Sequence, residues 1–223
     1  DMIFLPGSKN TMGDLRWMRQ NGLEAAVKKL AAHIPVWGIC GGYQMLGRTI
    51  SDPHGVENEN SLREPLRGME LIDTDTTLMP EKMRTQTRGK FENVTGIFST
   101  LSGLEFSGYE IHMGKTTVST GEHQTPLVQL ADGRTDGVQR MEKGSEEPGV
   151  YGSYVHGIFD DGDIAVRIVQ ALADKKKVSW KPEAGGDYHA FKEQQYDKLA
   201  QGLREHLDME YVYSILQESR ISS

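Results

Sequence analysis

The stretch VWGICGGYQMLG, from Val36 to Gly47, most constrains the fold of this chain, and it contains the only cysteine. An apolar run precedes the glycines and a helix-like apolar run follows them. A strand joined to a helix by a tight turn is a unit of α/β proteins with parallel strands. The pattern G-x-C-x-G from Gly38 to Gly42 is the thiol counterpart of the nucleophile elbow. It therefore predicts an α/β fold with Cys40 as a nucleophile above the edge of the sheet.

The segments on either side of this stretch repeat the order of strand and helix. MIFL, followed by Pro6 and Gly7, has the pattern of a short buried strand, and helical apolar spacing runs from Leu23 to Ala31. From Gly68 onward the chain is rich in β-branched and aromatic residues, as in VTGIF, SGYEIHMGKTTV and GVYGSYVHGIF. We therefore expect a mainly parallel central sheet with added antiparallel strands. Near the end we expect a helix whose apolar face comprises Tyr196, Leu199, Leu203 and Leu207.

The length of 223 residues and the hydrophobic content of 37% suffice for one sizeable core. We therefore expect a single domain over residues 1–223. The chain opens on Asp1 and passes at once into the strand-like MIFL. From this start we expect the chain to be a piece of a longer protein. We also expect this piece to lack the first strand and helix of such a fold.

Charge and hydropathy exclude several classes of function. The net charge of −7 would repel a phosphate backbone, so nucleic acid is not an expected partner. No apolar run approaches about 18 residues, which argues against a membrane span. A lone cysteine and the lack of a signal-peptide pattern favour a cytoplasmic location. The acidic cluster at Asp160, Asp161 and Asp163 is more typical of a helix N-cap than of a metal site, so we predict no metal.

A cysteine nucleophile usually needs a histidine within hydrogen-bonding reach. Most of the seven histidines lie in helix-end, loop or polar C-terminal segments, which leaves His112 and His156. His156 follows the apolar end of an expected strand and precedes Gly157, so it can project from a sheet edge as Cys40 does. Alone, such a histidine is more often structural. Paired with the elbow, His156 is the predicted base.

Four segments then occur in a characteristic order: LPGSKNT from Leu5 to Thr11, GICGGYQMLG from Gly38 to Gly47, GYEIHMG from Gly108 to Gly114, and GSYVHGIFD from Gly152 to Asp160. Together they resemble the class I, or triad-type, glutamine amidotransferases, and among them the glutaminase domain of the cobyric acid synthases of cobalamin biosynthesis. The elbow alone is typical of the whole superfamily, whereas GYEIHMG with LPGSKNT is narrower. The resemblance implies a flavodoxin-like, three-layer α/β fold with Cys40 and His156 at the C-terminal edge of its sheet.

The resemblance also implies a mechanism and roles for further residues. Cys40 would attack the side-chain amide of glutamine, and His156 would protonate the departing ammonia and then activate water to hydrolyse the glutamyl thioester. The oxyanion hole would use the Gly41 N–H and an N–H of the Gly7–Ser8 turn. Gln44 matches the glutamine of the family pattern C-x-G-x-Q and is expected to help hold the substrate.

In the family, the ammonia passes to a synthetase domain that precedes the glutaminase domain. That domain uses ATP and Mg²⁺ to amidate adenosylcobyrinic acid a,c-diamide, a corrinoid, as an amide ligase. We expect no cofactor in the present chain, because Lys9 is followed by Asn10 where a P-loop needs serine or threonine. The expected partners are glutamine and, through the synthetase domain, the corrinoid acceptor.

One position departs from the family pattern. Many class I enzymes carry a glutamate two residues after the histidine, but this chain has Ile158. Glu110 and His112 are candidates to support His156 or to line the ammonia route, although they would equally fit a solvated strand face. The alternatives for function are a related amidotransferase with another acceptor, as in cobyrinic acid a,c-diamide synthesis or muropeptide amidation, or a noncatalytic docking module. The presence of both Cys40 and His156 argues against the docking module.

Overall fold

The computed structural model describes residues 1–57, 64–119, 123–141, 149–182 and 188–221. Two compact units make up the chain, Asp1–Lys181 and Pro182–Ser223. The single amidotransferase domain over residues 1–223 stays a prediction. Within the described residues, no helix is long and apolar enough to cross a membrane.

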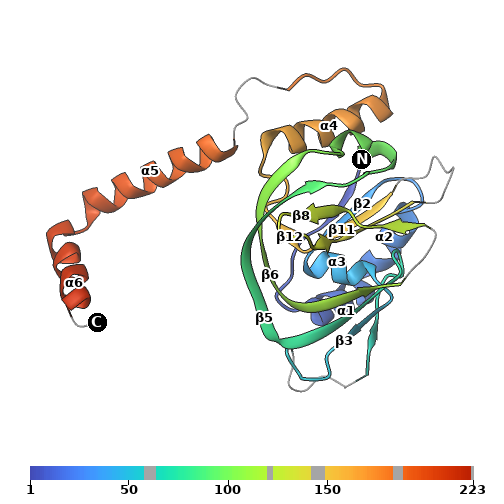
Figure 1. Ribbon diagram of the computed structural model, residues 1–223, viewed down its shortest axis with the longest axis horizontal. Coiled ribbons are helices and arrows are strands. Elements are labelled where there is room, and N and C mark those ends of the chain that lie inside the picture. The colour runs from blue at the N-terminus through green and yellow to red at the C-terminus, as the bar shows by residue number, and fades with distance from the viewer. Residues whose placement is uncertain (58–63, 120–122, 142–148, 183–187, 222–223) are drawn as a thin grey trace. The chain divides into compact units, whose positions relative to one another are not determined.

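A five-stranded sheet forms the centre of the first unit (Figure 1). Its order is β1 (Ile3–Leu5), β2 (Val36–Ile39), β11 (Val150–Ser153), β10 (Val138–Arg140) and β7 (Gln124–Thr125). The first three strands are parallel to one another, and β10 and β7 add antiparallel pairs. The predicted α/β fold, with parallel strands and antiparallel additions, is thereby confirmed.

Three helices follow the first two strands. They are α1 (Thr11–Gln20), α2 (Leu23–Leu30) and α3 (Gly41–Leu46). Asn10 caps α1 by accepting a hydrogen bond from the Gly13 N–H, as short polar side chains do at helix starts. The close contacts of α3 are with β2, β11 and β1, and α1 packs on α3. The helices therefore hold the segment after β1 beside the segment after β2.

Aromatic side chains cover the face of the central sheet that points away from α3. Trp37 on β2 is fully buried, and its ring stacks on Tyr151 with centroids 5.0 Å apart. Phe91, Phe98 and Phe159 approach the same indole ring at 6.3, 5.8 and 5.0 Å. Because successive strand residues face opposite ways, Trp37 points away from the face where Gly38 meets α3. β2 is therefore buried on both faces, as its unbroken apolar pattern predicts.

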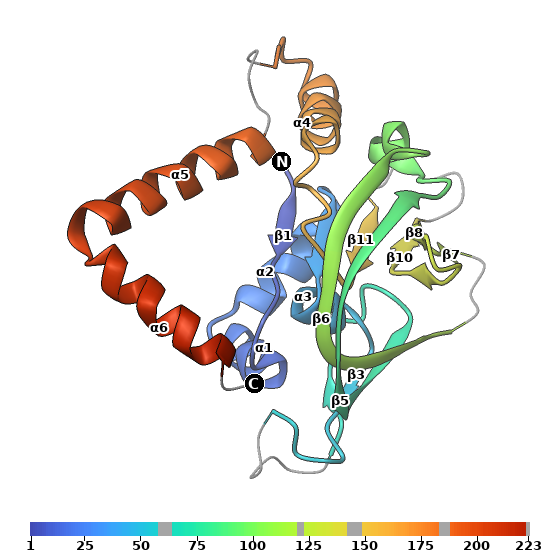
Figure 2. The same ribbon diagram turned by 60° about the vertical axis from the view of Figure 1, so that its left-hand side comes forward.

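A second, seven-stranded sheet packs beside the first. Its main order is β12 (Val155–His156), β6 (Glu105–Val118), β5 (Thr74–Phe91), β3 (Thr49–Ser51) and β4 (Leu66–Arg67). Off this path, β8 (Val128–Leu130) pairs with β5, and β9 (Thr135–Asp136) pairs with β8. β5 and β6 pair antiparallel over nearly their whole length. In Figure 1 and Figure 2 they form a long curved ribbon along one side of the first unit. Most of the expected antiparallel strands belong to this sheet.

Two expected strands were wrong in detail. VTGIF contributes to a 3-10 helix, η1 (Gly96–Leu101), because Gly96 has a φ of +70° and Phe98 and Leu101, three residues apart, are both buried. GVYGSYVHGIF is not one strand but two, β11 and β12, which lie in different sheets. His156 therefore belongs to the second sheet, although β11 brings the chain to the C-terminal edge of the first.

Helix α4 (Gly162–Lys176) completes the first unit and packs against η1. The second unit contains α5 (Tyr188–His206) and α6 (Met209–Ile221). The predicted C-terminal helix is thus confirmed in α5. Its apolar face is exposed, at Tyr196, Leu199 and Leu203, as is Leu207 just after the helix.

Candidate active site

Cys40 occupies a strained turn between β2 and α3. Its φ of +50° and ψ of −108° lie in a region that residues with a β-carbon rarely adopt, at a cost of about 1–3 kcal/mol. Gly38 and Gly42 permit this turn, because an added Cβ would lie 2.7 Å from the Gly42 backbone and 2.1 Å from the Leu5 carbonyl oxygen, respectively. The predicted tight turn between a strand and a helix at Cys40 is confirmed, whereas its role as a nucleophile stays a prediction.

The turn after β1 lies directly beside the elbow. The Gly42 N–H donates to the Pro6 carbonyl at 3.1 Å. A Cβ added at Gly41 would lie only 2.7 Å from the Ser8 backbone nitrogen. The two backbone segments that the resemblance assigns to an oxyanion hole, Gly41 and Gly7–Ser8, are therefore adjacent.

His156 lies across this turn from Cys40. A Cβ placed on Gly7 would be 2.9 Å from the His156 Cε1 atom and 3.7 Å from the Cys40 Cβ atom. Because Gly7 has no side chain, the space between the two side chains stays open. A larger residue at this position would displace the imidazole. The structure brings together Cys40, His156, Gly7, Ser8 and Gly41 from three separate parts of the sequence.

Burial sets the protonation of both side chains. It raises the pKa of Cys40 to about 11, an effect that the neighbouring Gly41 N–H only partly offsets. Burial also lowers the pKa of His156, and the nearby His112 lowers it further. At neutral pH the site holds a neutral thiol, 3.8 Å from the Ile111 carbonyl oxygen that accepts its hydrogen bond, and a neutral imidazole.

Sequence reasoning missed one aromatic neighbour of His156. The Tyr109 ring stacks on the imidazole, with centroids 5.1 Å apart and an interplanar angle of 7°. The two residues are paired across β6 and β12. Strand alternation offered a signal, because Tyr109 and Ile111 must face away from Glu110 and His112.

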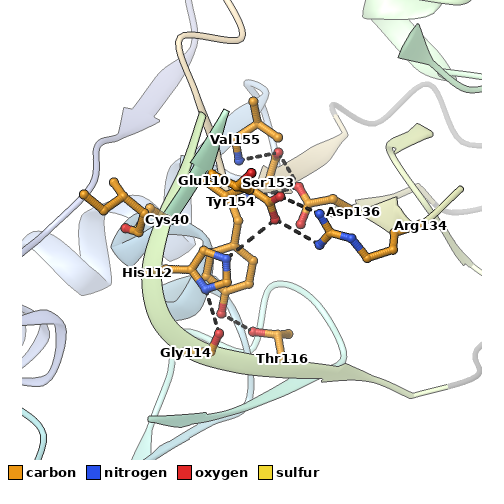
Figure 3. Close-up of polar contacts among 12 residues, drawn as sticks. Cys40, Glu110, His112, Gly114, Thr116, Arg134, Asp136, Ser153, Tyr154 and Val155 are labelled. Carbon is orange, nitrogen blue, oxygen red and sulfur yellow. Dashed lines mark hydrogen bonds and ion pairs between the residues drawn. The ribbon is translucent and has the colours of Figure 1, made fainter. Parts of the chain in front are cut away.

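Glu110 and His112 form a separate cluster with Arg134 (Figure 3). The Glu110 carboxylate is 2% exposed and accepts hydrogen bonds from Arg134 at 2.7 and 3.3 Å. His112 donates from Nδ1 to the Gly114 carbonyl at 2.8 Å, and its Nε2 lies 3.7 Å from a Glu110 oxygen, beyond hydrogen-bonding distance. His112 first, and then the Arg134 guanidinium, lower the pKa of Glu110 to about 2, although burial acts in the opposite direction. Neither residue forms a hydrogen bond or ion pair with His156 within the described part of the chain, so their support and ammonia-route roles stay predictions.

The same cluster borders a cavity of about 700 Å³. Its lining includes Glu110, His112 and Gly114 of β6, together with Arg134 and Asp136. In Figure 3, Cys40 and this cluster lie on either side of the β6 ribbon. The cavity is therefore separate from the space between Cys40 and His156.

Gln44 is buried beneath the elbow, with 3% of its surface exposed. Its Nε2 donates to the Tyr154 hydroxyl at 3.2 Å, while its Oε1 is buried with no hydrogen-bond partner among the described residues. Gly114 leaves room for it, since a Cβ there would lie 2.2 Å from Nε2. The substrate-holding role of Gln44 stays a prediction.

Glu57 is a second residue that the sequence analysis missed. Its two carboxylate oxygens accept hydrogen bonds from the Thr11 and Met12 N–H groups, both at 2.9 Å. A carboxylate at the start of a helix satisfies unpaired N–H groups and interacts well with the helix dipole. Glu57 thus fixes the start of α1, just after the Gly7–Ser8 turn, and its charge adds slightly to the raised pKa of Cys40. No local pattern indicates this contact over 46 residues.

The fold and the cysteine elbow are typical of α/β enzymes that use a cysteine nucleophile. Residues 1–164 match the family model of the CobB/CobQ-like glutamine amidotransferase domain. The chain therefore belongs to this family of glutamine amidotransferase domains, which confirms the resemblance found in its motifs.

Curated relatives extend the match over almost the whole chain. The cobyric acid synthase of Ruminiclostridium cellulolyticum is 46% identical over 98% of this chain, and that of Lachnoclostridium phytofermentans is 38% identical over 98%. The matched regions are 41% and 43% of those relatives, so the chain spans about two fifths of their length. A solved structure titled as a glutamine amidotransferase has a TM-score of 0.47 and 16% identity, over 79% of each chain.

Proposed function

We propose that this chain hydrolyses glutamine through a thioester on Cys40 and supplies ammonia for amidation of a corrinoid. The observation that carries the proposal is the convergence of His156 and Cys40 on Gly7: a Cβ placed there would lie 2.9 Å from the His156 Cε1 atom and 3.7 Å from the Cys40 Cβ atom. Membership of the glutamine amidotransferase family supports glutamine as the substrate.

The reaction begins from the neutral pair. As glutamine enters, the Cys40 sulfur attacks the side-chain amide carbon and His156 accepts the thiol proton. Because burial keeps the pKa of Cys40 at about 11, this proton moves together with the attack and no thiolate is formed beforehand. The Ser8 and Gly41 N–H groups stabilise the oxyanion of the tetrahedral intermediate.

The second half of the reaction regenerates the thiol. The imidazolium of His156 gives its proton to the leaving nitrogen, so ammonia departs and a glutamyl thioester remains on Cys40. Water then gives one proton to His156 while its oxygen attacks the thioester carbon. Collapse of that intermediate releases glutamate, and His156 returns the proton to the Cys40 sulfur. One water is consumed for each glutamine, and both side chains end in their starting forms.

The ammonia acceptor lies outside this chain. Relatives that share its sequence are named cobyric acid synthases and are more than twice as long, which supports a separate synthetase portion in the same polypeptide. We propose that this portion, in the cytoplasm, uses ATP and Mg²⁺ to amidate adenosylcobyrinic acid a,c-diamide. Gln44 would help to hold the glutamine, and the present chain needs no cofactor.

The test compares glutamine and ammonia as nitrogen donors for the full-length protein. Cys40→Ala should abolish glutamine-dependent amidation of the a,c-diamide and retain amidation with ammonium salts, because only the thioester step requires the sulfur. Mass spectrometry of the wild type, quenched during turnover, should find a glutamyl adduct on the peptide with Cys40. If Cys40→Ala uses glutamine as well as the wild type does, the proposal is wrong.

A further inference from the structure

The proposed reaction needs a fixed imidazole, yet among the residues that the structure describes no carboxylate forms a hydrogen bond with the His156 Nε2 atom. The Nε2 atom of His156 is buried and has no hydrogen-bond partner in the described part of the chain. Ile158, at the position where many class I enzymes carry glutamate, is fully buried in the hydrophobic core. The buried carboxylate of Glu110 is already held by Arg134. The orientation of the imidazole must therefore come from packing.

We propose that Tyr109 is the positioning residue that holds the His156 imidazole, by ring stacking, in the orientation that the reaction needs. This inference rests on the proposed glutaminase function. The rings are nearly parallel, at 7°, with centroids 5.1 Å apart, which is an offset stack. Aromatic rings stacked in this way attract one another beyond simple burial, which favours one orientation of the imidazole over its alternatives.

Strand pairing makes the stack a fixed feature and not a chance contact. β12 has only two residues, Val155 and His156, and β6 is its partner in the sheet. Tyr109 is directly opposite His156 in this register. The backbones are also unusually close, because a Cβ added at Gly108 would lie 2.4 Å from the His156 carbonyl oxygen. β6 thus fixes both the backbone and the ring of His156.

Gly7 limits the imidazole at a second point. An added Cβ there would come within 2.9 Å of the His156 Cε1 atom, so the ring has little room to move toward the turn after β1. Tyr109 lies against the face of the His156 imidazole, and Gly7 lies at its Cε1 edge. Together these two contacts restrict rotation of the His156 side chain. These two contacts thus orient the imidazole of His156, as the glutamate does in many other class I enzymes.

Because Tyr109 is exposed, its role in positioning His156 can be tested separately from any contribution to the hydrophobic core. Its side chain is 48% exposed, so truncation removes little buried surface. Val118 lies on the same strand and is also 48% exposed, but it is nine positions away from Tyr109. It therefore offers a matched control for loss of an exposed side chain from β6.

The experiment uses the full-length protein and three variants. Tyr109→Leu removes the ring, Tyr109→Phe keeps the ring but loses the hydroxyl, and Val118→Ala is the control. Tyr109→Leu should lower kcat with glutamine about tenfold or more, with KM for glutamine nearly unchanged, because a misplaced base slows chemistry without removing a substrate contact. Tyr109→Phe and Val118→Ala should stay within about twofold of the wild type, and all three should keep full ammonia-dependent amidation.

Four results would overturn the proposal. They are an unchanged kcat in Tyr109→Leu, a rise in KM alone, an equal loss in Tyr109→Phe, and a parallel loss of ammonia-dependent amidation. The second would indicate a substrate contact, the third a role for the hydroxyl, and the fourth a general structural role. Failure of the proposed function is distinguishable from all four, because the wild type itself would then show no glutamine-dependent activity.

Discussion

Gly7→Ala tests whether the space between Cys40 and His156 controls the reaction. The added Cβ would lie 2.9 Å from the His156 Cε1 atom, whereas ordinary contact begins at 3.4 Å, so the imidazole must retreat by at least the difference, 0.5 Å. The distance of 3.7 Å to the Cys40 Cβ atom is already ordinary, so the nucleophile need not move. Misplacement of a catalytic group by about 1 Å can cost on the order of 10²-fold, which predicts a loss of about tenfold in kcat for the smaller shift.

The loss of kcat in Gly7→Ala should be confined to the glutaminase step. Gly7 is exposed and does not have a positive φ, so alanine there is compatible with the backbone and should leave the thermal unfolding midpoint almost unchanged. The assay is glutamine-dependent amidation by the full-length protein, with ammonia-dependent amidation as the internal reference. Gly202→Ala is a matched control, because a Cβ there meets nothing within 4 Å. Full kcat in Gly7→Ala would refute the idea that the imidazole is confined at this point.

Two further predictions follow from the protonation of buried groups. Because burial raises the pKa of Cys40 to about 11, alkylation of this thiol by iodoacetamide at pH 8 should be on the order of 10²-fold slower than that of a free cysteine, whose pKa is about 8.5. Peptide mass spectrometry across a pH series checks this, and a half-maximal rate near pH 7 would contradict it. The pKa of Glu110 is lowered to about 2. The stabilisation that its carboxylate gives to the folded state is therefore present above the ordinary carboxyl pKa of about 4.3, and it is lost as the pH falls from about 4.3 toward 2. Glu110→Gln should cost on the order of 2 kcal/mol of unfolding free energy at pH 7 and flatten that acid dependence in urea titrations, whereas an unchanged acid dependence would show that another group is responsible.

The elbow was predictable because its determinants are local. The apolar run before Gly38, the glycines on both sides of Cys40 and the helical run after them lie within twelve residues, and each has a direct conformational meaning. His156 was predictable for a similar reason, since it follows an apolar segment and precedes a glycine. Local pattern therefore identified the two side chains that converge on Gly7 in the structure.

The missed features depend on contacts between distant segments. The apolar run around Tyr154 gives no sign that β11 and β12 belong to different sheets, because that division comes from the pairing of His156 with Tyr109 on β6. The raised pKa of Cys40 comes from burial, which depends on the whole fold and outweighs the lowering effect of the neighbouring Gly41 N–H. Glu57 reaches α1 over 46 residues and leaves no periodic signal.

The division between the two sheets has a consequence for the candidate site. Cys40, the proposed nucleophile, lies at the end of β2 in the first sheet, whereas His156, the proposed base, lies on β12 in the second. Only Tyr154 separates β11 from β12. β6 is the element that relates them, because Ile111 accepts the thiol hydrogen bond of Cys40 and Tyr109 stacks on His156. A shift of β6 would therefore alter the surroundings of both side chains at once, while a change in α3 would move Cys40 alone. Substitutions on the Tyr109 and Ile111 face of β6 should thus affect the glutaminase step more strongly than equally exposed substitutions elsewhere in the second sheet.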